Sequence, residues 1–183
     1  MISVVKRLAS PPVASKGKLK MQFKKGRVRS LYFVVSGLII AIISGCASVP
    51  KASSIQDNQA KLFKTHPQKS NLYIYRGHAQ GASIEMPLEI NGWHVATNLG
   101  QTYIKLQVKP GKHRIVSRAD NSDRLILATQ KNKNYFIFQD VKVGSSGRLT
   151  TLNLVSEAVG QAGVNECELI SLIPQATKLS LHQ

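Results

Sequence analysis

The sequence predicts an all-β fold, a small antiparallel β-sandwich or open barrel with a weak C-terminal helix. From Asn71 onward, apolar residues alternate with polar ones, as they do in half-buried strands. Turn pairs such as Asn91-Gly92 and Pro110-Gly111 separate these runs. Short strands at this spacing, with turn residues between them, are typical of sandwiches and open barrels.

Eight segments have the β-branched, aromatic and alternating composition of strands. They are residues 72–75, 86–90, 93–97, 103–109, 113–118, 124–129, 135–143 and 148–155. Pro87 has no N–H to donate, so we expect the second segment at a sheet edge. Asn91-Gly92 predicts a tight hairpin between the second and third segments, because both residues tolerate positive φ.

The segment from Tyr103 to Lys109 alternates most cleanly, with Ile104, Leu106 and Val108 on its apolar face. Pro110-Gly111 predicts a turn that returns residues 113–118 as its hairpin partner. We interpret the domain's aromatic residues as core rather than as a platform for stacking a ligand. They are Tyr73, Tyr75, Trp93, Tyr135, Phe136 and Phe138.

Residues 156–168 predict a helix with Ser156 as N-cap. Gly160 and Gly163 make it weak, each costing about 1 kcal/mol relative to alanine. The β-rich domain is therefore expected over residues 71–170, and residues 171–183 are expected to form a loose tail.

Residues 1–45 have the order of a secretory signal peptide: basic residues, then an apolar run from Leu31, then small residues. The run ends in Ile43-Ser44-Gly45-Cys46, which resembles the lipobox of bacterial lipoproteins. That resemblance implies cleavage between Gly45 and Cys46 and acylation of Cys46, with palmitate among the attached chains. The alternative is an uncleaved membrane helix, since Leu31 to Val49 carries no charge over a nearly spanning length.

We interpret Met21 as the true start, because a start at Met1 gives an unusually long basic leader. Whether the leader is cleaved or is retained as a membrane helix, the basic cluster before the apolar run stays cytoplasmic, so the domain faces outward. Ala47 follows Cys46, and resemblance to Gram-negative lipoproteins then implies the periplasmic face of the outer membrane rather than the inner membrane. Residues 46–70 are polar and are expected to form a lipid-anchored flexible tether.

The net charge of +16 is divided between the leader and the domain. Residues 1–45 hold nine Lys and Arg and no acidic residue, hence +9, which leaves +7 for the remainder. The domain's basic residues cluster on one expected hairpin: Lys105, Lys109, Lys112, Arg114 and Arg118. We weigh a patch for anionic lipid or acidic glycan against an ordinary solvated sheet face, and we expect no nucleic-acid partner.

No catalytic set is recognisable. The His residues lack zinc-ligand spacing, so no metal and no cofactor is expected. Acylation of Cys46 would leave Cys167 unpaired, and we interpret it as a buried thiol. We therefore expect no enzyme but a binding or structural module with an envelope protein as partner; an envelope hydrolase or small-ligand carrier is the alternative.

Five short segments in order resemble a family of small Gram-negative lipoprotein domains catalogued as a domain of unknown function. They are Asn71-Leu72-Tyr73-Ile74-Tyr75-Arg76, Ile90-Asn91-Gly92, Gly100-Gln101-Thr102-Tyr103, Lys109-Pro110-Gly111-Lys112-His113 and Asn134-Tyr135-Phe136-Ile137. The resemblance covers roughly residues 57–155. It implies an envelope location and a β-rich fold, and it carries no catalytic residue.

Overall fold

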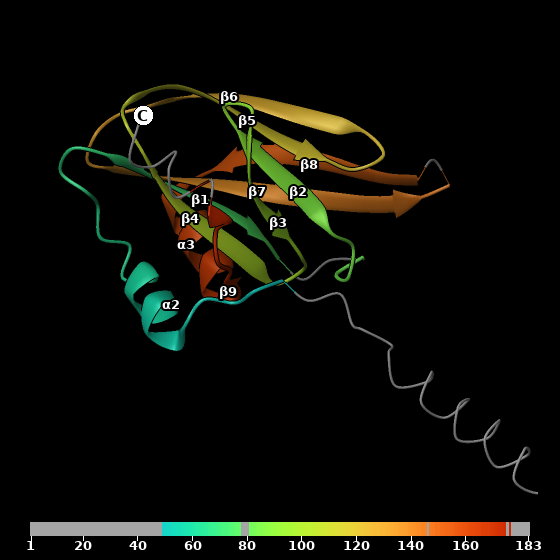
Figure 1. Ribbon diagram of the computed structural model, residues 1–183, viewed down its shortest axis with the longest axis horizontal. Helices are drawn as coiled ribbons and strands as arrows, with labels where there is room; N and C mark the ends of the chain where they lie inside the picture. Colours follow the sequence, from blue (N-terminus) through green and yellow to red (C-terminus); the bar gives the residue numbers. More distant parts are fainter. Residues whose placement is uncertain (1–48, 78–80, 146, 175, 177–183) are drawn as a thin grey trace, which may run out of the picture. The chain divides into compact units, whose positions relative to one another are not determined.

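The computed structural model describes residues 49–77, 81–145, 147–174 and 176. Their strands form two sheets with a helical layer (Figure 1), which confirms the all-β sandwich. The strands are β1 (Ser70–Arg76), β2 (Met86–Ile90), β3 (Trp93–Asn98), β4 (Thr102–Val108), β5 (Gly111–Arg118), β6 (Ser122–Thr129), β7 (Lys133–Gly144), β8 (Gly147–Val155) and β9 (Glu168–Leu169). The helices are α2 (Ser54–Ala60) and α3 (Glu157–Asn165).

The five-stranded sheet has the order β8-β7-β1-β4-β9, and the four-stranded sheet has the order β3-β2-β5-β6. Neighbouring strands are antiparallel except for two pairs, β1 with β7 and β4 with β9, which are parallel. A parallel pair cannot be joined by a tight turn. The chain between β1 and β7 therefore visits the other sheet before it returns.

The predicted hairpin across Pro110-Gly111 is wrong. Strand β4 pairs with β1, whereas β5 pairs with β2 and β6 in the other sheet. The turn is therefore a corner that passes the chain from one sheet to the other. Gly111 has a φ of 149°, which suits glycine at such a corner. The prediction failed because alternation shows which face of a strand is apolar, not which strand lies beside it.

Strand β2 was expected at an edge because of Pro87, and this is also wrong. It lies between β3 and β5. The pairing of β2 with β5 runs only from Leu88 to Ile90, so Pro87 lies one residue outside it. The missing N–H is tolerated at this position because the ladder to β5 has already ended.

The main core fills the space between the two sheets and consists mainly of aliphatic residues. The alternation predicted for β2 and β4 is confirmed, because the alternating apolar residues of both strands are buried, and all of them except Met86 belong to this core. The cluster contains Leu72, Ile74, Leu88, Ile90, Val95, Ala96, Ile104, Leu106, Val108, Ile115, Leu127, Ile137, Leu152, Ile170 and Ala176. Ala176 is fully buried, so the first part of the predicted loose tail packs on the core instead.

A second cluster lies on the other face of the five-stranded sheet, under α2 and α3 (Figure 1). The rings of Tyr73 and Phe136 stack with centroids 4.9 Å apart, and Tyr73 lies 6.4 Å from Tyr103. Tyr103 lies on the face of β4 opposite Ile104, Leu106 and Val108, and the helices cover that face and bury it. The expected core role is confirmed for Tyr73 and Phe136, whereas it is wrong for Trp93, whose exposed fraction is 54%.

A chain of buried polar side chains joins the two sheets inside the sandwich. The amide of Asn98 donates to Gln139 Oε1 at 3.0 Å, and Gln139 Nε2 donates to Ser117 Oγ at 2.7 Å. Ser117 Oγ lies 2.6 Å from Thr150 Oγ1. Asn98 and Ser117 belong to one sheet, and Gln139 and Thr150 belong to the other. Buried polar groups must find partners, so this chain restricts how the sheets can slide past each other.

The free edge of β8 is occupied by side chains from the turn between β5 and β6 and from the start of β6. Asp120 accepts a hydrogen bond from the backbone N–H of Arg148, and Asn121 accepts one from Thr150. Asp123 accepts one from the N–H of Leu152 at 2.7 Å. An edge whose amides already have acceptors is a poor template for pairing with another chain.

The flexible tether expected over residues 46–70 is wrong for its described part. Ser53 and Gln56 form a capping box, which begins α2 at Ser54. Ala60 at the end of this helix is buried. Residues 66–69 form a turn closed by the N–H of Lys69 donating to the carbonyl of His66. The segment is polar in composition, but its few apolar residues suffice to pack it on the sheet.

Helix α3 begins after Ser156, as predicted, and ends at Asn165, earlier than expected. Its two glycines are explained by close packing. A Cβ at Gly160 would lie 2.1 Å from Phe136 Cβ, and one at Gly163 would lie 2.2 Å from the Tyr75 ring. The helix therefore approaches the sheet at a distance that only glycine allows.

We predict that Gly160→Ala lowers the free energy of unfolding by about 1–3 kcal/mol, because the added methyl group collides with Phe136. In an unobstructed helix, a glycine-to-alanine substitution would instead raise the free energy of unfolding. Denaturant titration measures the change. Gly144→Ala is the matched control, since no atom lies within 4 Å of its added Cβ. Equal stability of the wild type and Gly160→Ala would contradict the packing argument.

Candidate functional site

The residues with predicted lipidation chemistry, Gly45 and Cys46, lie outside the described residues. The chain after them joins the domain at Lys51, which forms a bridge with Ile170. The N–H of Ala52 donates to the carbonyl of Leu169 at 2.9 Å, and the N–H of Ser171 donates to the carbonyl of Pro50 at 2.8 Å. The N-terminal segment is thus held directly against β9.

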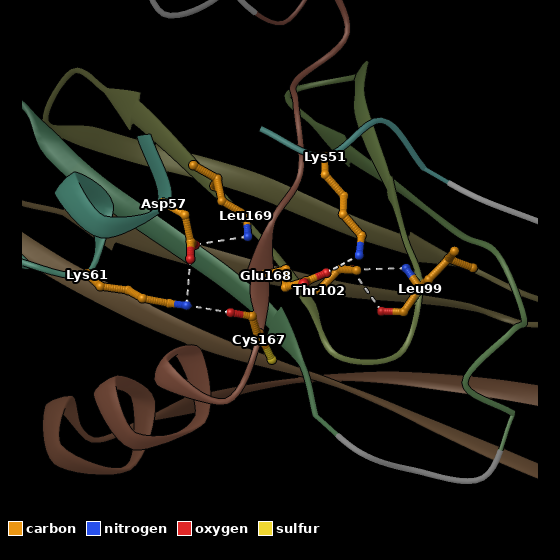
Figure 2. Close-up of polar contacts among 8 residues, drawn as sticks. All are labelled: Lys51, Asp57, Lys61, Leu99, Thr102, Cys167, Glu168 and Leu169. Atoms are coloured by element: carbon orange, nitrogen blue, oxygen red, sulfur yellow. Dashed lines mark hydrogen bonds and ion pairs between the residues drawn. The ribbon is translucent and has the colours of Figure 1, made fainter. Parts of the chain in front are cut away.

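Asp57 in α2 is the centre of the polar contacts that fasten this segment (Figure 2). Its carboxylate accepts hydrogen bonds from Lys61 Nζ at 2.8 Å, from the Tyr103 hydroxyl at 2.8 Å and from the N–H of Leu169 at 3.1 Å. Lys61 Nζ also donates to the carbonyl of Cys167 at 2.7 Å. One carboxylate therefore connects α2 with β4 and β9.

The pKa of Asp57 is lowered. Burial acts to raise the pKa, but the hydrogen bonds from Lys61, Tyr103 and Leu169 outweigh it. Burial and the Asp57 carboxylate raise the pKa of Tyr103, so its hydroxyl remains a donor. The arrangement has the residue types of an acid–base site, yet each group is already occupied by another part of the fold.

Cys167 is buried next to this cluster, which confirms the interpretation of a buried thiol. Its Sγ donates weakly to the carbonyl of Arg76 at 3.4 Å. Burial, assisted by the charge of Glu166, raises the pKa of the thiol to about 11. A nucleophilic cysteine needs a lowered pKa and access to solvent. Cys167 has neither property.

A hollow of about 580 Å³ lies where the chain enters the domain. It is lined by Val49, Lys51, Leu99, Gly100, Gln101, Thr102, Glu166 and Glu168. Lys51 and Glu168 form an ion pair across it, and the Thr102 hydroxyl is bonded to the backbone N–H and carbonyl of Leu99 (Figure 2). Within the described chain, no group of three or more His, Cys, Asp or Glu residues is placed to hold a metal ion.

The five residues predicted as a basic patch do not lie together, because the expected hairpin does not exist. Lys105 is in β4 of the five-stranded sheet, and its Nζ lies 5.5 Å from the centre of the Tyr73 ring. Desolvation lowers the pKa of this lysine. Lys109 lies at the corner between the sheets. The remaining three, Lys112, Arg114 and Arg118, lie on the outward face of β5.

Arg118 is occupied by an ion pair with Glu89, with Nε 2.5 Å from the carboxylate. The hydrogen bond from Arg118 is the main cause of the lowered pKa of Glu89, and the charges of His94 and Arg114 contribute. Arg118 is therefore partly neutralised, whereas the guanidinium of Arg114 has no hydrogen-bond or ion-pair partner among the described residues.

Arg124 was not predicted from the sequence, and it completes a basic hollow on this face. The hollow measures about 490 Å³ and is lined by Arg114, Val116, Ser122, Asp123 and Arg124. Arg124 lies directly opposite Val116, and Arg114 lies opposite Ile126, so the two arginines are diagonal neighbours on adjacent strands. Only the register of β5 with β6 brings them together, and alternation within either strand does not reveal it.

His94 in β3 and His113 in β5 are separated by β2. His94 Nε2 lies 2.9 Å from the carbonyl of Ala96. His113 Nε2 lies 2.8 Å from the carbonyl of Lys109, and its Nδ1 lies 3.1 Å from Asn91 Nδ2. Each ring therefore has its own local partners.

The fold and these contacts define a two-sheet β domain with a helix-covered face, whose N-terminal segment is fastened to β9. Residues 66–150 match the family described as "Protein of unknown function (DUF2846)". An uncharacterized protein of Haemophilus influenzae is 33% identical over 147 residues, which cover 78% of this chain and 86% of that relative. The chain belongs to this family of unknown function, which confirms the resemblance to a domain of unknown function; its lipoprotein character stays a prediction. No solved structure matches it significantly.

We predict that Asp57→Asn is less stable than the wild type at neutral pH by about 1–3 kcal/mol, because charge-assisted bonds from Lys61 and Tyr103 are weakened. The folded-state pKa of Asp57 is lowered, so its contribution is present above the unfolded-state pKa and is lost as the pH falls through the folded-state value. The stability difference should therefore shrink as the pH falls below about 4.

Urea titrations over a pH series measure this difference. Glu85→Gln is the control, since Glu85 is an exposed carboxylate and should show little difference at any pH. A difference for Asp57→Asn that stays constant with pH would contradict the assignment.

Proposed function

We propose that this chain is a lipid-anchored protein of the bacterial cell envelope. In this proposal the leader is removed before Cys46, Cys46 is acylated, and the domain faces outward from the cytoplasm. We place it on the periplasmic face of the outer membrane, with the inner membrane as the less favoured location. The domain then serves as a non-catalytic binding or structural module, with another envelope protein as its partner.

The observation that carries the proposal is the leader. Basic residues precede an uncharged run that begins at Leu31, and Ile43-Ser44-Gly45 stands immediately before Cys46. Small residues suit a peptidase groove that binds its substrate in extended form, and cysteine supplies the thiol for acylation. Several acyl chains on one residue make attachment durable, since a single chain binds a membrane only marginally.

The position where the chain joins the domain supports the same proposal. Among the described residues, Lys51 is the first that forms a β-bridge, its partner being Ile170, and it follows Cys46 by five residues. Five residues span at most about 18 Å. An acyl group on Cys46 would therefore hold this domain close to the bilayer, not at the end of the long spacer that the polar composition suggested.

The described side chains favour a binding or structural role over the hydrolase alternative. The Cys167 thiol is buried with a raised pKa, and the Asp57 carboxylate is engaged by three donors. In the hollow beside Lys51, the ion pair with Glu168 engages two of the three charged side chains that line it. A small-ligand carrier would need an apolar pocket with a few free polar groups.

The uncleaved membrane helix is the alternative attachment. Among residues 49–77, 81–145, 147–174 and 176, no helix is long and apolar enough to cross a membrane. Both attachments expose the domain on the same side of the membrane, because the basic cluster before Leu31 is retained in the cytoplasm.

We predict that the wild type incorporates radioactive palmitate in cells and that Cys46→Ala does not, because the thiol is the acylation site. Cys167→Ala is the matched control: it removes the other cysteine, which is buried, and should be labelled like the wild type. The mass of the purified wild-type protein tests cleavage before Cys46. Equal labelling of wild type and Cys46→Ala would refute the lipoprotein, and a retained leader would favour the uncleaved helix.

A further inference from the structure

We propose that the outward face of β5 and β6 docks on anionic phospholipid headgroups of the bilayer that holds Cys46. This inference rests on the proposed anchoring. The docking face is defined by Lys112, Arg114, Val116, Ser122 and Arg124, and its centre is the hollow between the two arginines.

The charges on this face favour an anionic occupant. Lys112, Arg114 and Arg124 are exposed and carry three positive charges. Glu89 is the carboxylate beside them, and it is already paired with Arg118. The side chains of Arg114 and Arg124 have no hydrogen-bond or ion-pair partner in the described part of the chain. An unpaired guanidinium presents a planar set of donors that matches phosphate geometry.

The hollow has the composition of a phosphate site. The guanidinium groups of Arg114 and Arg124 come from adjacent strands, the Ser122 hydroxyl adds a donor, and Val116 supplies an apolar floor. Asp123 also lines the hollow. Its carboxylate oxygens are engaged by the backbone N–H groups of Arg124 and Leu152, at 2.8 Å and 2.7 Å. Two arginines therefore outnumber one carboxylate that is already bound.

The short connection to Cys46 selects the membrane as the anionic surface. Lys51, which forms a β-bridge with Ile170, follows Cys46 by only five residues. Five residues reach at most about 18 Å, so acylated Cys46 would hold the whole domain close to the headgroups. Tethering at this distance keeps headgroups at a high effective concentration.

The test uses the chain from Ala47 to Gln183, which lacks Cys46, so its result does not depend on acylation. This chain contains both core clusters of the domain. Its binding is measured by sedimentation with vesicles of phosphatidylcholine alone and of phosphatidylcholine mixed with phosphatidylglycerol. We expect binding to the mixed vesicles only, and we expect it to weaken with added salt.

Arg114→Gln and Arg124→Gln should each lower the partition coefficient about fivefold, and the double variant should lower it roughly thirtyfold. The matched control is Lys133→Gln with Lys142→Gln, which removes the same charge from exposed positions on β7. The control should change binding less than about twofold, since these residues lie on the other sheet. Thermal unfolding followed through the lone tryptophan, Trp93, verifies that all variants fold.

Three results would overturn the proposal: no binding to the mixed vesicles, equal loss in the arginine and lysine double variants, or equal binding to soluble polyglutamate, which would identify an acidic polypeptide as the occupant. Failure of palmitate labelling with successful vesicle binding would refute the anchoring at Cys46 and leave the docking face intact. Successful palmitate labelling without binding to the mixed vesicles would refute the docking face alone.

Discussion

Strand β1 is buried on both faces along its whole length, and the other elements are arranged to cover it. Leu72 and Ile74 face the second sheet, while Tyr73 and Tyr75 face the helices. A strand with two apolar faces cannot leave either one in water, because the hydrophobic free energy of each buried side chain is about 1.5–3 kcal/mol. The four-stranded sheet covers one face of β1. The polar-looking segment before Ser70 and the glycine-containing α3 satisfy the other.

Covering the aromatic face explains why Asp57 has so many partners. Helix α2 has only seven residues, which is too short to be stable alone. Its position depends on Ala60 packing under the sheet and on the carboxylate of Asp57 receiving donors from Lys61, Tyr103 and Leu169. The polar contacts of Asp57 in Figure 2 thus serve chiefly to hold α2 against the five-stranded sheet. This structural role accounts for the lack of a free reactive group among them.

The sequence located the strands well, because alternation and turn residues are local signals. All eight expected segments are strands, and Asn91-Gly92 forms the tight turn with positive φ at both residues. Pairing was predicted poorly, since the corner at Pro110-Gly111 looks the same as a hairpin turn. The tether was misjudged because composition does not show that Ala60 would be buried.

The basic residues on β5 and β6 were also predicted only where the signal was local. Lys112, Arg114 and Arg118 were predicted from their place on one expected hairpin, and they do share the outward face of β5. Lys105 was assigned to the same face only because β4 was expected beside β5. Arg124 was missed because its closeness to Arg114 follows from the register of β5 with β6, and register is a non-local property. Cys46 lies outside the described residues, so its chemistry remains a prediction from the leader alone.

The contact between the first and last segments of the domain has a mechanical consequence. Residues 50–52 are joined to residues 169–171 by backbone hydrogen bonds, including those of Ala52 with Leu169 and of Ser171 with Pro50. Tension applied from Cys46 would therefore act on these hydrogen bonds before it reached any strand of the sandwich. Because β9 is itself bonded to β4, the force would pass next into the five-stranded sheet. In the proposed lipoprotein, the resistance of the folded domain to a pull on its anchor would begin with these few interstrand hydrogen bonds.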